Sequence, residues 1–429
     1  MGKKRVLVYP CGTEIGLEIY RAVCNSIHFE LIGGSSSYDH GRFVFKNHID
    51  GLPFITDESG PDEIEAFQHQ IEEYGIDYIY PAMDGVLYKF AEYKDLLGCG
   101  IIAPDFSTAR ITRSKKLTYE TLKGLVPVPK LFDIHENLTF PLFMKPDVGQ
   151  GSAGANKICS KEDLDYFLNK SGSKKMLLME YLPGEEYTVD CFTNRKQELV
   201  YAGCRGRNRI KGGISVNAVA QDDEIVLDMA QTINSRLKQK GGWFFQVKRN
   251  ERGDYTLMEV ASRIAGASSF TRNLGVNLPL LTLHLFSGND IGSVICNRYC
   301  LELDRALQNT FKTDIRYSRV YVDYDDTLLV DNKLNIQLVA FLYQCVNNHI
   351  PITLLSKHTS NLEEELKERR IRDLFDSIQV LDREEQKYLY IKEKDSIFID
   401  DSYGERAEVY NKLKINVFDT HMIECLINE

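Results

Sequence analysis

Two carboxylates stand two positions apart where a predicted strand ends, at Asp323 and Asp325, and the apolar segment 317–322 precedes them. One carboxylate at such a strand end can attack phosphorus and hold Mg²⁺, while its neighbour passes the proton of the leaving group. A lone Asp-x-Asp is more often a solvated turn, so phosphoryl chemistry needs support from residues further along the chain.

Two later segments supply that support: one predicted strand ends in Ser356, and another ends in Asp400 and Asp401. The hydroxyl can bond a phosphoryl oxygen, and the two carboxylates can complete an oxygen-rich Mg²⁺ site. Because the carboxyl ends of parallel strands meet at one sheet edge, we expect these groups to converge.

In this order the motifs resemble the haloacid dehalogenase (HAD) superfamily, which includes both phosphatases and domains that only bind or regulate. The resemblance implies a capless HAD-like Rossmannoid domain over residues 315–429, with Asp323 as nucleophile and Asp325 as proton donor. Ser356 and Lys387 would hold the phosphoryl oxygens, and Lys392 and Lys394 are the less favoured candidates for that cation. The implied Mg²⁺ ligands are Asp323, Asp325, Asp400 and Asp401.

A cap domain is not expected in this region. Only 28 residues separate Thr327 from Ser356, and 30 separate Ser356 from Lys387. These gaps hold no more than the helices of the fold itself. The site is therefore open, or the remainder of the chain covers it.

A second chemical feature lies within residues 140–154, where a strand ends in Lys145 and the small-residue loop 149–154 follows. The glycines satisfy G-x-G-x-x-G, but another strand comes next, so we do not expect a dinucleotide fingerprint. Backbone N–H groups of such a loop can approach phosphates while the ammonium neutralises their charge. The alternative is a plain flexible hairpin.

Gln246 and Glu259 are predicted to face one another across a hairpin. The strands 243–247 and 255–260 are joined by a turn at Gly253, so the two side chains can lie on adjacent antiparallel strands. Their oxygens are hard ligands that suit Mg²⁺.

Over roughly residues 1–290 the chain resembles the ATP-grasp enzymes. The residues that carry the resemblance are Lys145 with its loop, the stretch 180–182, and Gln246 with Glu259. The likeness is strongest to the carboxylate–amine ligases of the carbamoyl-phosphate-synthetase type. It implies ATP and Mg²⁺ as cofactors, with Gln246 and Glu259 binding the metal. The implied ATP-binding residues are Lys115 (or its neighbour Lys116), Lys145, Gly151, Ser152, Glu180, Tyr181, Leu182 and Glu186.

Three arginines complete the resemblance, and one position departs from it. Arg263 would hold the acyl phosphate or its carboxylate precursor. Arg205 and Arg207 could bind substrate, the alternative being solvated charges. The family usually reads Glu-x-Asn-x-Arg, whereas Ala261 stands at the third position here and cannot coordinate a metal.

The elements that position these residues fall into three predicted domains of an α/β chain. A βαβ rhythm over 1–104 predicts a parallel, doubly wound sheet, as in the Rossmann-like domain that precedes an ATP-grasp fold. Strand–loop–strand units over 105–312 predict the α+β ATP-grasp domain, with a helix at Arg113–Lys123. The HAD-like domain would occupy 315–429.

Composition narrows the class of protein. A net charge of −10 argues against a general nucleic-acid or membrane-surface binder, and no apolar run approaches the length of a membrane span. Ten cysteines without a Cys-x-x-Cys pair, and an apolar run of only four residues before Pro10, predict a cytoplasmic protein with reduced thiols. The sequence leaves open whether the protein forms a homodimer.

The leading interpretation is a bifunctional enzyme. It would join a small-molecule carboxylate to an amine through an acyl phosphate, and hydrolyse a phosphate ester with its last domain. The first alternative is a HAD phosphatase with a regulatory, nucleotide-binding ATP-grasp module, which Ala261 favours. The second is a non-catalytic nucleotide-binding regulatory protein, which the complete set of acids disfavours.

Overall fold

The computed structural model describes residues 2–172, 175–221, 223–297, 299–307, 311, 313–359 and 361–427. It divides the chain into two compact units, Met1–Leu307 and Gln308–Glu429. The regions predicted as the first two domains thus pack within one unit. Residue 312, the predicted end of the second domain, lies outside the described residues.

The first unit begins with β1 (Lys4–Tyr9), β2 (Phe29–Gly34), β3 (Asn47–Ile49), β4 (Tyr78–Pro81) and β5 (Gly100–Ile101). These strands form a parallel sheet in the order β3-β2-β1-β4-β5. The helices around it are α1 (Glu14–Val23), α2 (Gly41–Val44), α3 (Pro61–Ile71), α4 (Asp84–Glu92) and α10 (Leu278–Phe286).

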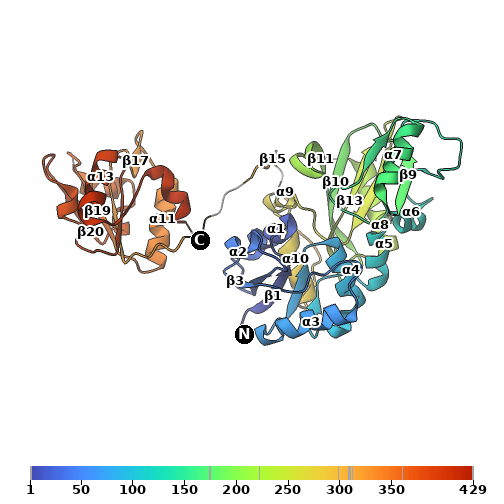
Figure 1. Ribbon diagram of the computed structural model, residues 1–429, viewed down its shortest axis with the longest axis horizontal. Helices are drawn as coiled ribbons and strands as arrows, with labels where there is room; N and C mark the ends of the chain where they lie inside the picture. The colour runs from blue at the N-terminus through green and yellow to red at the C-terminus, as the bar shows by residue number, and fades with distance from the viewer. Residues whose placement is uncertain are drawn as a thin grey trace. The chain divides into compact units, whose positions relative to one another are not determined.

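Helices cover both faces of this sheet (Figure 1). Because side chains alternate along a strand, Val6 and Val8 of β1 pack with α1 and α10, whereas Leu7 and Tyr9 pack with α3 and α4. Both faces are therefore buried, as a parallel sheet requires. The carboxyl end of β1 leads directly to α1, whose first turn reaches the candidate site.

Two antiparallel sheets follow in the same unit, ordered β6-β9-β7-β8 and β14-β13-β10-β11-β12-β15. The smaller comprises β6 (Leu131–Phe132), β7 (Leu142–Pro146), β8 (Asn156–Ile158) and β9 (Met176–Glu180), with α7 (Lys161–Ser171) against it. The larger comprises β10 (Glu186–Thr193), β11 (Leu199–Lys211), β12 (Ile214–Gln221), β13 (Gly241–Arg249), β14 (Tyr255–Ala261) and β15 (Glu302–Asp304). Helix α8 (Glu224–Leu237) packs on the larger sheet, and the short helix α9 (Ser269–Asn273) follows β14.

The helix predicted at Arg113–Lys123 is confirmed as α6 (Lys115–Leu122), and a helix that was not predicted, α5 (Phe106–Arg113), precedes it. Ser114 interrupts them in an extended conformation, and its Oγ accepts a hydrogen bond from the backbone N–H of Leu117 at 3.1 Å. The same hydroxyl donates to Asp147 at 2.8 Å. Such a cap begins α6 and fixes it to the loop after β7.

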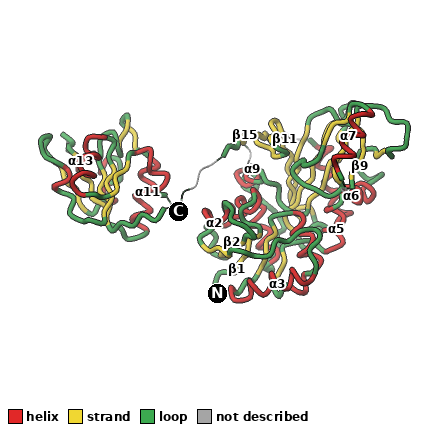
Figure 2. The backbone as a smooth tube through the Cα atoms, viewed as in Figure 1, coloured by secondary structure: helices red, strands yellow, loops and turns green. Residues whose placement is uncertain are grey.

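The second unit contains β16 (Arg319–Val322), β17 (Leu329–Val330), β18 (Lys333–Leu334), β19 (Ile352–Ser356), β20 (Ser377–Val380), β21 (Ser396–Ile399) and β22 (Asn416–Phe418). Five of them form a parallel sheet ordered β20-β19-β16-β21-β22, while β17 and β18 form a separate hairpin. Its helices are α11 (Ile336–Asn347), α12 (Leu362–Glu368) and α13 (Tyr403–Leu413). Figure 2 shows strands in the middle of this unit with helices around them.

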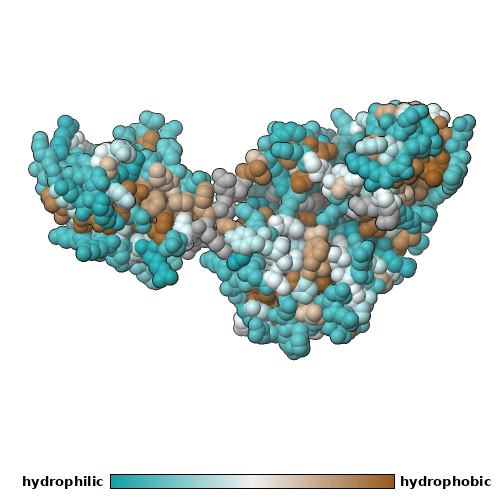
Figure 3. Space-filling model, viewed as in Figure 1, coloured by the Kyte–Doolittle hydropathy of each residue, from teal (hydrophilic) through white to brown (hydrophobic). Residues whose placement is uncertain are grey.

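The surface in view is mainly hydrophilic in both units, with small hydrophobic areas (Figure 3). Among the described residues, no helix has the length and apolar character that crossing a membrane would need.

Candidate functional site

Lys145 lies at the end of β7 and is only 6% exposed. Its Nζ donates a hydrogen bond to the backbone carbonyl of Met258 at 3.0 Å. Burial, together with the charge of Lys115, lowers the pKa of Lys145 to about 7. An anion placed beside this amine would favour its charged form, so the environment suits a phosphate.

The loop after β7 has a conformation that exposes its backbone. Gly151 and Ser152 both have a positive φ, of 63° and 57°. A Cβ on Gly213 would lie 2.5 Å from the carbonyl oxygen of Gly151, so only glycine allows the turn between β11 and β12 to approach this loop. Arg207 donates to the Gly213 carbonyl at 2.7 Å and holds that turn in place.

One cavity of about 140 Å³ brings together most of the residues predicted to bind nucleotide and metal: Lys115, Lys145, Gly151, Ser152, Glu186, Gln246 and Glu259. Gln246 of β13 pairs directly with Glu259 of β14, as the sequence predicts. The two side chains therefore present oxygens on the same side of the sheet, which fits a hard divalent cation such as Mg²⁺.

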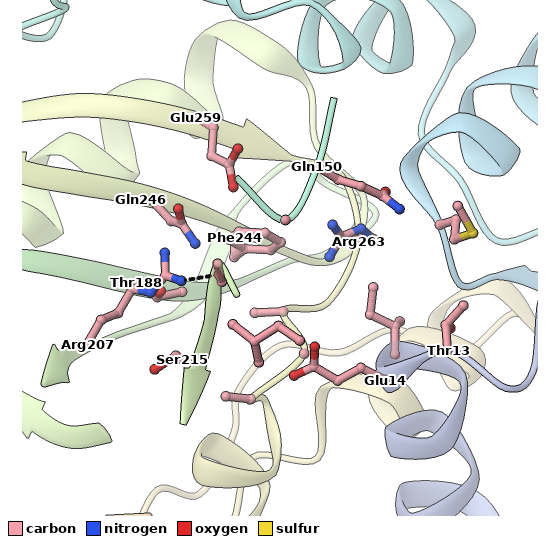
Figure 4. Close-up of a pocket in the computed structure, with 18 of the residues that line it drawn as sticks. Thr13, Glu14, Gln150, Thr188, Arg207, Ser215, Phe244, Gln246, Glu259 and Arg263 are labelled. Carbon is pink, nitrogen blue, oxygen red and sulfur yellow. Dashed lines mark hydrogen bonds between the residues drawn. The ribbon is translucent and has the colours of Figure 1, made fainter. Parts of the chain in front are cut away.

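A second cavity of about 280 Å³ shares Gln246 and Glu259 with the first. Figure 4 shows both side chains on neighbouring strands, with Thr13 and Glu14 of the α1 region approaching from the parallel-sheet part of the unit. Glu14 forms an ion pair with Arg305, which follows β15. The start of α1 and the larger antiparallel sheet thus line this cavity together, next to the candidate metal ligands.

Arg263 also lines this second cavity, but much of its guanidinium is already engaged. Nε and Nη2 donate to the two carboxylate oxygens of Asp84, at 2.8 and 2.6 Å, and Nη1 donates to the Ile264 carbonyl at 3.0 Å. A guanidinium has five N–H donors, so two remain for a substrate. Asp84 thereby orients the arginine from α4.

The interpretation of Arg205 and Arg207 as solvated charges is wrong. The side chains of Arg205 and Arg207 are 1% and 6% exposed, and both line the second cavity. Arg205 pairs with the buried Asp190 at 2.9 Å, and Arg207 pairs with Glu186. Arginines paired in this way are fixed in orientation, because hydrogen bonds between charged groups are strong and directional.

The stretch Glu180–Leu182 is not among the described residues that line the cavity with Lys145. Glu180 instead lines a separate cavity formed mainly by residues 123–131, and its carboxylate accepts the backbone N–H of Lys130 at 2.9 Å. The Tyr181 ring lies under the ammonium of Lys157, 4.2 Å from its centroid. The role of the stretch Glu180–Leu182 as an adenine hinge, which the resemblance implies, stays a prediction.

Ala261 ends β14 and is 7% exposed, packed with Phe244 and Ala265. A small cavity of about 40 Å³ reaches Ala261 together with Glu259 and Arg263. A space of that size admits a water molecule, which can take the place of the missing side-chain ligand.

In the second unit, Asp323, Lys387 and Asp400 form a buried group. The Nζ of Lys387 lies 2.8 Å from Asp323 and 2.6 Å from Asp400. Burial, reinforced by the charge of Asp323, raises the pKa of Asp400 to about 7. Two buried carboxylates around one ammonium leave a net negative site, which suits a divalent cation.

Oxygens of Asp323, Asp400 and Asp401 lie within 4.8 Å of one another, so these three can share one cation. Asp401 accepts a hydrogen bond from Thr327 at 3.0 Å, which orients it. The structure does not bring Asp325 into this group. Its side chain is 50% exposed and lies against His358 instead. Ser356, at the end of β19, is buried.

Several residues that shape these sites carried no sequence signal. Asp84 and Arg263 are 179 positions apart, and their pairing depends on how α4 packs near β14. Asp147 holds both the Ser114 hydroxyl and the backbone N–H of Lys116, at 2.8 Å each. His358 follows the predicted strand end at Ser356 by two residues, and that closeness is the one signal that could have identified it.

The match to a family model lies within the first unit. Residues 172–303 match the family model described as "ATP-grasp in the biosynthetic pathway with Ter operon". A D-alanine–D-alanine ligase of Phocaeicola vulgatus is 25% identical over 156 residues, covering 32% of this chain and 47% of the ligase. That of Clostridium botulinum is 25% identical over 236 residues, covering 49% and 75%. The chain thus spans about half the length of the first of these relatives and three quarters of the second.

A solved structure shares its fold with much of this chain. N5-carboxyaminoimidazole synthetase from Staphylococcus aureus, complexed with ADP, superposes with a TM-score of 0.57 at 14% identity, over 69% of this chain and 80% of that one. ATP-grasp enzymes use ATP and Mg²⁺. The family-model match and the shared fold together support an ATP-grasp domain in this chain.

Proposed function

We propose that the first unit is an ATP- and Mg²⁺-dependent carboxylate–amine ligase. The observation that carries this proposal is the meeting of Lys145, Gln246 and Glu259 at a cavity that continues toward Glu14. Lys145 and the loop 149–154 would neutralise and hold the phosphates. Gln246 and Glu259 would bind Mg²⁺, where electrostatic stabilisation of the transferring phosphoryl group is the main catalytic effect.

The reaction would have two balanced steps. A substrate carboxylate oxygen attacks the γ-phosphorus of ATP, and the bond to ADP breaks. An amine then attacks the acyl carbon, phosphate leaves with the electron pair of its bond, and the amine loses a proton. Because the similar ligases are named for D-alanine, amino acids are the first substrates to test.

The experiment is an ADP-release assay with Mg²⁺, ATP and pools of D- and L-amino acids. ADP formation that requires both an acid and an amine would support ligation. ATP binding without ADP formation would favour the two regulatory alternatives, in which the ATP-grasp module only senses nucleotide.

We expect Ala261→Asn to retain ligase activity and to lower the Mg²⁺ concentration needed for half-maximal ADP formation. The reason is that the asparagine would add an oxygen ligand next to Glu259, in space that the small cavity already provides. Ala261→Val, which adds bulk without an oxygen, is the matched control. A higher Mg²⁺ requirement for Ala261→Asn than for Ala261→Val would contradict the proposed position of the metal.

A second function is proposed for the second unit: Mg²⁺-dependent hydrolysis of a phosphate monoester. The buried contacts of Lys387 with Asp323 and Asp400 favour it, since they gather nucleophile, cation and metal ligands in one place. Asp323 would attack phosphorus, and the leaving oxygen would take a proton from Asp325 as its bond to phosphorus breaks. Water would then hydrolyse the aspartyl-phosphate, with Asp325 accepting the proton.

A further inference from the structure

His358 contacts the predicted proton donor of the second unit. It lies two residues after β19, and its side chain is 12% exposed. Nδ1 is 2.9 Å from each carboxylate oxygen of Asp325. The side chain of Asp325 is 50% exposed. Among the hydrogen bonds of the described residues, the contact with His358 is the one that holds its carboxylate in place.

The imidazole is itself held firmly from two further directions. Nε2 lies 3.1 Å from Glu365 of α12, and the ring of the fully buried Tyr324 meets the imidazole edge-on, 5.2 Å between centroids and at 86°. The Tyr324 hydroxyl donates to the same Glu365 at 3.2 Å. His358 is therefore a rigid support, because a helix and a core residue determine its orientation.

Asp325, in contrast, stands on a turn that does not restrict its side chain by packing. The next residue, Asp326, has a φ of +54°, so the chain turns sharply here and leaves Asp325 at the surface. Without a partner, a half-exposed aspartate would sample several rotamers. A proton donor must instead lie within about 3.2 Å of the leaving oxygen, so one rotamer must be selected.

We propose that His358 is a positioning residue that selects the rotamer from which Asp325 exchanges protons with the leaving group and with water. This inference rests on the phosphatase function proposed above. His358 does not touch the phosphoryl group in this account, and its effect passes entirely through Asp325. Loss of the support would displace the carboxylate, and a displacement of about 1 Å can cost about 100-fold in rate.

The test compares two substrates with the full-length protein. An alkyl phosphate needs protonation of its poor leaving group, whereas p-nitrophenyl phosphate releases an oxygen that needs little assistance. We expect His358→Ala to lower kcat/KM for the alkyl ester by about 100-fold and for the aryl ester by less than about threefold. His358→Asn keeps one donor near the position of Nδ1 and should give an intermediate loss.

A double variant separates positioning from stability. In an Asp325→Asn background, His358→Ala should cause no additional loss, because its route of action is already removed. His349→Asn, at an exposed histidine after α11, is the control and should behave as wild type. Thermal unfolding shows which variants fold; if His358→Ala does not, His358→Asn decides by the same comparison.

Three results for His358→Ala would overturn the inference while the phosphatase function stood. They are an equal fall in kcat/KM with both esters, no fall with either, or a fall that persists in the Asp325→Asn background. Wild-type protein that hydrolyses neither ester with Mg²⁺ would overturn the phosphatase function, and the inference with it.

Discussion

Asp323→Asn is expected to eliminate hydrolysis of aryl phosphates, by at least about 10⁴-fold, while the second unit stays folded. Asp323 is 5% exposed, follows the end of β16, and lies 2.8 Å from Lys387. Asparagine keeps the shape and a carbonyl oxygen for the ammonium, and it loses the nucleophilic carboxylate. Lys387 also keeps its contact with Asp400, so no charge is left buried without a partner.

The measurement is release of p-nitrophenol with Mg²⁺, with thermal unfolding as the check on folding. Asp331→Asn is the matched control: Asp331 is exposed and has a φ of +48°, which asparagine tolerates. Asp325→Asn should slow turnover less completely, since that residue assists proton transfer only. An Asp323→Asn protein with the wild-type rate would refute the assignment of the nucleophile.

Glu259→Gln is expected to abolish ATP-dependent ligation, with ADP formation falling by at least about 100-fold at saturating Mg²⁺. Even residues that merely orient a metal ligand cost about 10–100-fold when replaced, and Glu259 would bind the metal directly. Gln246 opposite it supplies only a neutral oxygen, and Ala261 supplies none. Two amide oxygens without a carboxylate hold Mg²⁺ weakly.

Glu251→Gln, in the exposed turn between β13 and β14, changes the same charge away from the site and serves as the control. Substrate-dependent ADP formation by Glu259→Gln at the rate of that control would show that the metal lies elsewhere.

Local pattern predicted the parts of the first site that depend on neighbouring strands. The turn at Gly253 brings β13 and β14 side by side, and a register shift between Gln246 and Val247 makes Glu259, rather than Met258, the direct partner of Gln246. The position of Lys145 at a strand end followed likewise from an apolar run before a glycine-rich loop.

Long-range packing determined the parts that the sequence did not predict. The pairing of Arg205 with Asp190 depends on β11 lying beside β10, the two strands that carry these residues, and an arginine within a polar stretch gives no sign of that. The break at Ser114 depends on its contact with Asp147, 33 positions away. His358 acquired its contacts with Asp325 and Glu365 only when β19 and α12 packed beside the turn after β16.

Calorimetric titration with Mg·ATP tests the central claim, an ATP-binding site at Lys145, most directly. The account predicts that wild-type protein binds Mg·ATP and that Lys145→Met binds more than about tenfold more weakly, since a charge-assisted hydrogen bond contributes about 1.5–3 kcal/mol. Lys161→Met, at an exposed lysine of α7 outside this cavity, should bind nearly as tightly as wild type. Wild-type protein that does not bind Mg·ATP, or Lys145→Met with unchanged affinity, would contradict the account.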